Sequence, residues 1–189
     1  MKKLIIGISG ASGIIYGIRM LQILKTVEEI ETHLIMSQSS YTTLKIESNV
    51  SLSHVQELAD VVHNVQNIAS SISSGSFKTI GMVVLPCSIK TLSSIVNSYS
   101  DSLLTRAADV VLKEKRKLVL CLRETPLHIG HLNMMITAAQ LGAIIMPIVP
   151  AFYHYPNNLD QIINQTVNRI IDQFDIILSQ DLFVRWNGI

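Results

Sequence analysis

Short apolar runs alternate with amphipathic segments along this chain, and that alternation limits its fold more than any other feature. The apolar runs of strand length span 4–8, 32–37, 79–87, 117–123 and 143–148. Apolar residues at helical spacing occupy 14–25, 38–46, 102–115, 127–141 and 158–178, and a further helix begins at Ser88. Parallel strands need crossover connections of helical length, so this order predicts βαβ units. We therefore expect an α/β protein whose parallel sheet lies between two layers of helices.

The length of the chain, 189 residues, suits one domain with a sizeable core. We expect residues 1–189 to form a single three-layer, doubly wound domain of the flavodoxin-like or Rossmann-like kind. The segment 51–77 is rich in Ser, Asn and His. This least regular part of the pattern is expected to hold a short helix and one short strand.

Charged residues make up 15% of the chain and hydrophobic residues 48%. A usual charged fraction is about 25%, so we expect part of the outer surface to be buried against further copies of the chain. The formal net charge is +1 and the sequence has no Lys/Arg block, which leaves little attraction for nucleic acid or anionic membranes. The composition thus predicts a homo-oligomer that binds no nucleic acid and no membrane surface.

Residues 132–153 contain no Asp, Glu, Lys or Arg, and a run of that length could span a bilayer. Polar and helix-breaking residues interrupt it, among them Asn133, Gly142 and Pro147. A helix that stops at Gly142, followed by a buried strand, accounts for the run better than a membrane span does. We expect no transmembrane helix.

The first predicted strand leads into a loop, "GISGASG", in which Gly7, Gly10 and Gly13 are spaced three apart. Ligands of parallel α/β sheets bind outside the carboxyl ends of the strands. The loop lacks the G-x-G-x-x-G spacing of dinucleotide sites and the lysine of a P-loop. The second strand ends in Ser37, where an NAD site would need an acid. The loop therefore indicates either a mononucleotide or phosphate at the helix start, or a tight turn that needs glycine for close helix packing.

Polar side chains follow other predicted strands at the same edge of the sheet. Ser88 and Thr91 lie at a helix start, where hydroxyls and backbone amides can face an anion. Arg123 and Glu124 follow the strand 117–123, ahead of Pro126, which we expect to open the next helix. A single Arg is commonly a surface ion-pair partner. Several hydroxyls and an Arg on one rim, however, favour a site for a phosphorylated aromatic cofactor.

The cysteine and histidine residues offer little chemistry of their own. Cys87 and Cys121 both end predicted strands, and no secretory signal precedes them, which is typical of reduced thiols in a cytoplasmic protein. No His–Asn or His–Asp pairing that would activate Cys87 is visible, so we expect a core thiol. His128 and His131 lack the partners of a zinc motif, and we expect no metal site.

The chain resembles the UbiX family of flavin prenyltransferases in the stretches "GISGASGIIYGIRML", "LPCSIKTLSSI", "LLTRAADVVLKEKRKLVLCLRETPLHIGHLNMM", "PIVPAFYH" and "RIIDQF". The resemblance extends from the first strand to the last helix and is weakest at 48–77. It implies that FMN is bound and that a dimethylallyl group passes from dimethylallyl phosphate to N5 and C6 of reduced FMN. It also implies a metal-independent dodecamer whose product, prenylated FMN, serves a UbiD-type decarboxylase in ubiquinone or aromatic-acid metabolism.

The resemblance also assigns site residues, position by position. The FMN-contacting positions are Gly10, Ala11, Ser12, Ser37, Ser88, Ile89, Lys90, Thr91 and Arg123. The positions that hold the prenyl phosphate are Tyr153 and Arg169, with Arg106 and Lys113 completing a basic cluster, partly across subunits. Catalytic positions are Glu47 and Glu124, with Ser12 near the flavin ring, and Trp186 matches an aromatic residue near the prenyl group.

Alternatives remain beside this assignment. Tyr155, Ser98 and Ser102 depart from the family's usual Arg, Gly and Asn, which leaves the details of the rim open. A flavin-dependent cysteine decarboxylase would carry a His in the helix 14–25 and a P-x-M-N-x-x-M-W motif, and this chain has neither. A flavin-binding module without activity would not need the basic residues. Arg169, beside an apolar helix face, would then simply extend its charged end into water.

Overall fold

A parallel sheet forms the centre of the computed structural model, which describes residues 1–188. In that part of the chain the sheet has six strands in the order β3-β2-β1-β4-β5-β6. The strands are β1 (Lys2–Ile8), β2 (Ile30–Met36), β3 (Val61–His63), β4 (Gly81–Cys87), β5 (Lys117–Leu122) and β6 (Ile144–Ile145), and all paired strands run parallel. The chain order reverses between β1 and β4, which is the switch point of a doubly wound sheet. The predicted fold class is confirmed.

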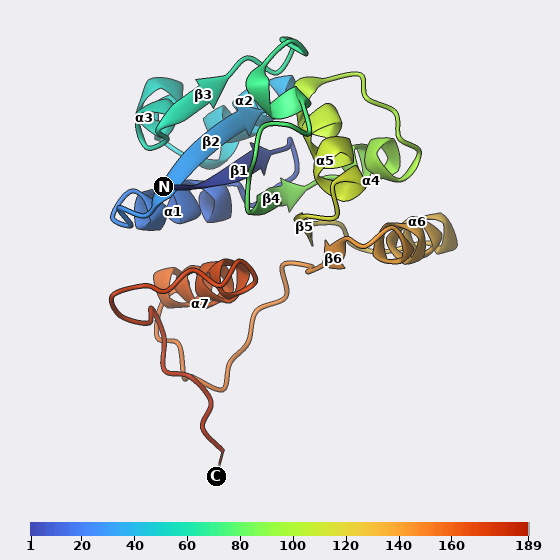
Figure 1. Ribbon diagram of the computed structural model, residues 1–189. Coiled ribbons are helices and arrows are strands. Elements are labelled where there is room, and N and C mark those ends of the chain that lie inside the picture. Colours follow the sequence, from blue (N-terminus) through green and yellow to red (C-terminus); the bar gives the residue numbers. More distant parts are fainter. Residues whose placement is uncertain (189) are drawn as a thin grey trace.

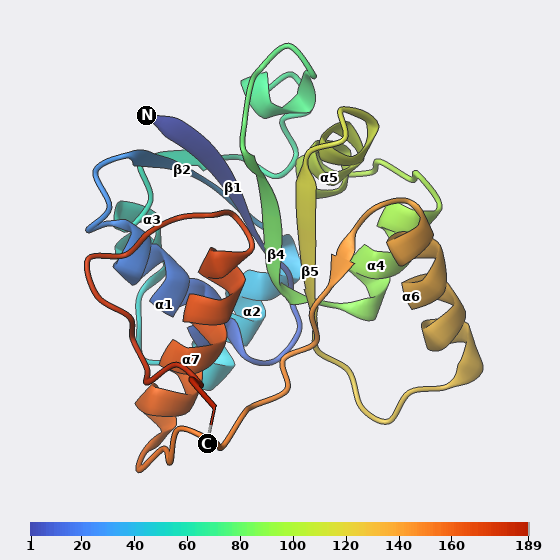
Figure 2. The same cartoon turned by 60° about the horizontal axis from the view of Figure 1, so that its bottom comes forward.

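Helices cover both faces of the sheet (Figures 1 and 2). They are α1 (Ile14–Leu24), α2 (Gln38–Glu47), α3 (Leu52–Glu57), α4 (Ile89–Val96), α5 (Leu103–Lys113), α6 (Ile129–Gln140) and α7 (Leu159–Asp172), with a 3-10 turn η1 (Ser71–Ser73). One apolar cluster joins the sheet to α1, α3 and α7, and another joins it to α4, α5 and α6. Figure 2 shows α1 and α7 on one side of the strands and α4 and α6 on the other.

The strands explain the apolar runs of the sequence. Leu4, Ile6 and Ile8 of β1 join the cluster under α1, while Ile5 joins the opposite cluster. Every residue of β4 is buried. A strand covered on both faces has no solvent side, so its sequence is continuously apolar and does not alternate with polar residues.

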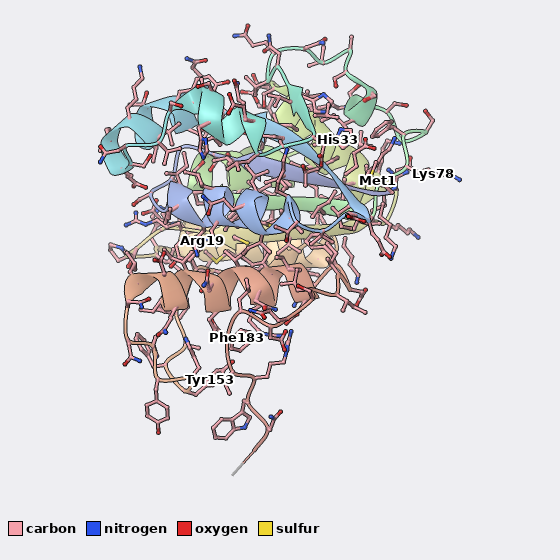
Figure 3. The ribbon with its side chains drawn as sticks, turned by 90° about the vertical axis from the view of Figure 1, so that its left-hand side faces the viewer. Met1, Arg19, His33, Lys78, Tyr153 and Phe183 are labelled. Carbon is pink, nitrogen blue, oxygen red and sulfur yellow. The ribbon has the colours of Figure 1, made fainter. Side chains whose placement is uncertain are left out.

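Helix α7 packs beside α1 and is tied to it by one arginine. Arg19 of α1 donates from Nη2 to Asp160 Oδ1 and from Nη1 to Asn164 Oδ1, both at 2.6 Å. Figure 3 shows Arg19 between the two helices. This contact fixes α7 against the sheet layer, so the opposite side of α7 is free to carry other groups.

Several predicted boundaries differ from the structure. Helix α6 begins at Ile129, because His128 caps it by accepting a hydrogen bond from Gly130 N at 3.0 Å, so Pro126 lies before the helix and does not open it. The predicted strand 143–148 is reduced to β6. Helix α7 ends at Asp172, three residues before Asp175, whose left-handed φ of 55° no α-helix continues through.

Other expectations hold. The segment 51–77 carries α3, β3 and η1, as the sequence predicted for a short helix and one short strand. Within residues 1–188, none of the helices combines the length and the apolar character that a membrane span needs.

Gly17→Ala is expected to lower the free energy of unfolding by about 1–3 kcal/mol. A Cβ at this position of α1 would lie 2.6 Å from the carbonyl oxygen of Leu85 and 2.9 Å from Cδ1 of Ile8, so helix and strand would have to separate. The midpoint of urea unfolding, followed by circular dichroism, measures the loss.

Gly7→Ala is the control for this variant, because a Cβ there meets only side-chain ends, Met82 Cε at 3.0 Å and Leu104 Cδ1 at 3.5 Å, which can shift. Equal losses in the two variants would contradict the proposed close approach of α1 and β4.

Candidate functional site

A cleft of about 570 Å³ opens at the carboxyl edge of the sheet, next to the switch point. Its lining comes mainly from the residues that follow β2 and β4 and from the start of α5. The lining residues are Ser37, Gln38, Ser39, Thr42, Val65, Gln66, Ser88, Lys90, Thr91, Ser94, Asp101, Ser102, Leu104 and Thr105. The cleft thus includes four of the residues assigned to FMN, namely Ser37, Ser88, Lys90 and Thr91.

Three helices begin at this cleft, each with a serine as its N-cap. Ser37, Ser88 and Ser102 accept hydrogen bonds from the backbone N–H three residues later, at 3.2, 3.3 and 3.4 Å respectively. The helices α2, α4 and α5 therefore direct the positive ends of their dipoles toward the same space. Lys90 adds a full positive charge to the lining. This arrangement favours an anionic group such as a phosphate.

Ser9 joins the two strand ends that flank the switch point. Its side chain is 1% exposed, donates to the carbonyl oxygen of Pro86 at 2.7 Å and accepts from the backbone N–H of Ser88 at 2.8 Å. The loop after β1 and the start of α4 are therefore held in one fixed relation. No sequence pattern indicated this role of Ser9.

The loop after β1 is a tight turn in which two positions require glycine. A Cβ at Gly10 would overlap the side chain of Ser39, and Gly13 has a left-handed φ of 94°. Thr43 also donates to the carbonyl oxygen of Gly10 at 2.9 Å, which holds the loop against α2. Close packing therefore accounts for the two glycines, and it is compatible with a ligand at the neighbouring edge.

Glu47 caps the start of α1 from the end of α2. Its Oε2 accepts from the backbone N–H of Gly13 at 2.8 Å and of Ile14 at 3.2 Å. Partial burial alone would raise the pKa of Glu47, but hydrogen bonds from the Ser12 hydroxyl and these two amides, with the nearby charge of Arg123, hold it below its ordinary value. The structure thus brings Ser12, Glu47 and Arg123 together, around an ionised carboxylate.

Glu124 follows Arg123 in the exposed loop after β5, and its Oε1 accepts from the backbone N–H of Thr125 at 3.0 Å. Gly10, Ala11 and Ile89 belong to the same edge of the sheet, in the loop after β1 and at the start of α4.

A second, smaller hollow of about 250 Å³ lies against α7. It is lined by Tyr153, Arg169, Phe183, Arg185 and Trp186. The Tyr153 hydroxyl accepts from Gln165 Nε2 at 3.3 Å, and Arg169 pairs with Asp172 at 2.8 Å. Figure 3 shows Tyr153 and Phe183 on the side of α7 that faces away from α1. Three residues assigned to the prenyl phosphate and prenyl group, Tyr153, Arg169 and Trp186, are therefore neighbours.

Arg106 and Lys113 do not join that hollow within one chain. Both lie on α5, in the helix layer opposite α7. Arg106 pairs with Asp109 at 2.8 Å and donates to the carbonyl oxygen of Ser73 at 3.3 Å, while Lys113 pairs with Glu114. A cluster of Tyr153 with all three basic groups would need side chains from more than one copy of the chain.

The two cysteines are core residues, as predicted. Cys87 and Cys121 are both 0% exposed, and burial raises the pKa of each thiol. In the part of the chain that the structure describes, no three His, Cys, Asp or Glu side chains gather in a way that could hold a metal ion.

Sequence reasoning missed several lining residues of the cleft, chiefly Ser94, Asp101 and Thr105. Ser102 was noted only as a departure from the family pattern, yet it caps α5 and shares a capping box with Thr105. The pattern Ser-x-x-Thr before an apolar run was the available signal for that cap.

Comparison with known proteins identifies the family. The Flavoprotein family model matches residues 1–164. The flavin prenyltransferase UbiX of Salmonella typhimurium is 68% identical over 188 residues, which covers 100% of both chains. The chain belongs to the UbiX family of flavin prenyltransferases. The resemblance that the sequence motifs indicated is thereby confirmed.

Solved structures of the family share the fold over the whole chain. AnUbiX (PadA1), crystallised with FMN and dimethylallyl pyrophosphate, has a TM-score of 0.95 and is 44% identical, covering 100% of this chain and 98% of that one. A dodecameric FMN-dependent UbiX-like decarboxylase from Escherichia coli O157:H7 has a TM-score of 0.94 and is 46% identical, covering 99% of this chain and 100% of that one.

Glu47→Gln is expected to lower the free energy of unfolding by about 1 kcal/mol at pH 7, because it removes the negative charge at the start of α1. The pKa of Glu47 is lowered in the folded chain, so the carboxylate contributes its full stability above the ordinary value of 4.5. That contribution disappears as the pH falls through the lower pKa of the folded state. Urea unfolding at pH 7 and at pH values below 4.5 measures both effects.

Glu28→Gln serves as the control, since Glu28 is exposed on the turn between α1 and β2. A loss in Glu47→Gln that is the same at both pH values would show that its charge does not stabilise α1.

Proposed function

We propose that the chain transfers a dimethylallyl group from dimethylallyl phosphate to N5 and C6 of reduced FMN, giving prenylated FMN. The observation that carries this proposal is the cleft at which α2, α4 and α5 begin. Its donors are helix-start amides, hydroxyls and Lys90, which suit the single phosphate of a mononucleotide. The FMN and dimethylallyl pyrophosphate bound in AnUbiX, a protein 44% identical to this one, support the same pair of ligands.

The residues at the two sites would have different roles. Ser37, Ser88, Ile89, Lys90 and Thr91 would hold FMN at the cleft, with Gly10, Ala11, Ser12 and Arg123 along its edge. When bound, reduced FMN supplies the electron-rich ring that accepts the prenyl group. Glu47, kept ionised by its hydrogen bonds, would orient the Ser12 hydroxyl and the Arg123 guanidinium beside that ring. Glu124 would act from the loop after β5.

The prenyl phosphate would be held by positive charge. The C–O bond of an allylic phosphate breaks more easily when cations and hydroxyls stabilise the departing phosphate. Tyr153 and Arg169 would provide these donors from the hollow on α7, and Arg106 and Lys113 would provide them from another copy of the chain. Trp186 would place an aromatic ring beside the developing allyl cation.

The location, assembly and partner of the chain are proposed from its family. We propose that residues 1–189 act as one flavoprotein domain in the cytoplasm, that the chains assemble as a dodecamer and that prenylated FMN passes to a UbiD-type decarboxylase. Exposed apolar side chains on α6, namely Ile129, Leu132 and Ile136, support assembly because water is an unfavourable environment for them. We further propose that the reaction needs no metal, since the sequence has no D-D-x-x-D motif of the kind that holds magnesium and diphosphate.

Incubation of the purified protein with reduced FMN and dimethylallyl phosphate tests the reaction, with mass spectrometry of the flavin as the measurement. We expect a flavin heavier by one dimethylallyl group, formed equally well after thorough chelation. A parallel incubation with dimethylallyl diphosphate establishes which donor is preferred. Release of FAD in place of FMN on denaturation, or transfer that depends on added magnesium, would contradict the proposal.

Arg169→Ala is expected to reduce kcat/KM for dimethylallyl phosphate by about 10- to 100-fold, because it removes a cation that would stabilise the departing phosphate. The loss is limited because the guanidinium is partly exposed, so water can replace some of its interaction. The fold and the FMN content should remain. Lys78→Ala is the control, since Figure 3 places Lys78 at the opposite end of the molecule from Tyr153. Near wild-type efficiency of Arg169→Ala at limiting dimethylallyl phosphate would make Arg169 a surface residue only.

A further inference from the structure

The segment after α7 reaches back to that helix through side-chain contacts. The backbone N–H of Leu182 donates to Asn168 Oδ1 at 2.9 Å, and Arg185 reaches Asp172. Figure 1 shows this segment leaving α7 on the side away from the sheet. The hollow that contains Tyr153 and Arg169 is therefore closed in part by residues 183–186.

Arg185 holds the segment through two carboxylates, an arrangement that we name the tail clamp: Arg185, Asp172 and Asp181. Arg185 donates from Nη1 and Nη2 to the two oxygens of Asp172, both at 2.8 Å. It also donates from Nε and Nη2 to the two oxygens of Asp181, both at 2.6 Å. Paired N–H···O bonds of this kind fix the orientation of a guanidinium as well as its position.

The tail clamp shares one atom with Arg169. Asp172 Oδ2 accepts from Arg185 Nη1 and also from Arg169 Nη1, each at 2.8 Å. The hydrogen bond from Arg185 lowers the pKa of Asp172, partial burial raises it, and Arg169 lowers it further, with a net decrease. Asp172 therefore stays ionised and ties the orientation of Arg169 to that of Arg185.

Trp186 depends on the same clamp. Its ring meets the Tyr153 ring edge-on, with centroids 6.0 Å apart, yet the side chain is 59% exposed. A side chain that buries so little surface gains little from packing alone. Arg185, the residue before Trp186, makes the hydrogen bonds of the tail clamp. The clamp therefore fixes the backbone next to Trp186 and with it the position of the indole.

We propose that Asp172 and Arg185 are positioning residues for prenyl-phosphate binding: Asp172 aims Arg169 into the hollow, and Arg185 holds Trp186 against Tyr153. This inference rests on the proposed function of the hollow as the site of the substrate's phosphate. Asp172 acts through Arg169, which it contacts, and Arg185, which lines the hollow, acts through the neighbouring Trp186.

The first test requires no substrate, because Trp186 is the only tryptophan of the chain. In the FMN-free protein, Asp172→Asn is expected to shift Trp186 emission to longer wavelength and to increase its quenching by acrylamide, since the clamp loses its central charge. Asp175→Asn is the matched control: it removes a carboxylate three residues later, which pairs with Lys117 and not with the tail. Emission and quenching unchanged in Asp172→Asn, or changed equally in both variants, would overturn the clamp.

The second test separates positioning from general stability. Asp172→Asn is expected to raise the KM for dimethylallyl phosphate about tenfold, with a smaller change in kcat and unchanged FMN content. In the Arg169→Ala background the same substitution should raise the KM by clearly less than tenfold, because the part of its effect that passes through Arg169 is already lost. Full additivity of the two substitutions would overturn the positioning role. If the wild-type protein transfers no prenyl group, the proposed function fails, and the fluorescence test still decides whether the clamp exists.

Discussion

The reversal of strand order between β1 and β4 is the constraint on which the rest of the molecule depends. The helices that connect β1, β2 and β3 cover one face of the sheet, and the helices that connect β4, β5 and β6 cover the other. The helices that follow β2 and β4 therefore begin at one edge and on either side of a gap. Their first N–H groups cannot all be satisfied within the helices. A polar cleft with several helix starts at its edge is thus a result of topology before any special side chain is considered.

The two halves of the site are held by different forces. At the cleft, Ser9, Ser37 and Ser88 are fixed by short-range hydrogen bonds to the backbone, and Ser9 is buried. At the hollow, Arg169 of α7 and Arg185 of the segment after it are held by ion pairs near the surface, which salt weakens. Hydrogen bonds to the backbone therefore hold the cleft in place, whereas ion pairs between side chains hold the hollow on α7.

The alternation of apolar and amphipathic segments was sufficient to predict the sheet, its helical layers and the residues at the strand ends, because each depends on local periodicity. The contact of Glu47 with Gly13 joins residues 34 positions apart, and no sequence pattern near either residue predicts it. The boundary at α6 was missed because a histidine, which is not a usual capping residue, caps the helix. The separation of Lys113 from Arg169 likewise follows from the layer each helix occupies, which spacing along the chain does not encode.

Cys87 shows a chemical benefit of the buried end of β4. It directly precedes Ser88, the N-cap of α4 and the first residue after β4 that lines the cleft. Peroxide oxidises the thiolate and not the neutral thiol. Since burial raises the pKa of Cys87, the sulfur stays protonated at neutral pH. Close packing at the end of β4 thereby leaves Cys87 unreactive, although the next residue along the chain lines the cleft.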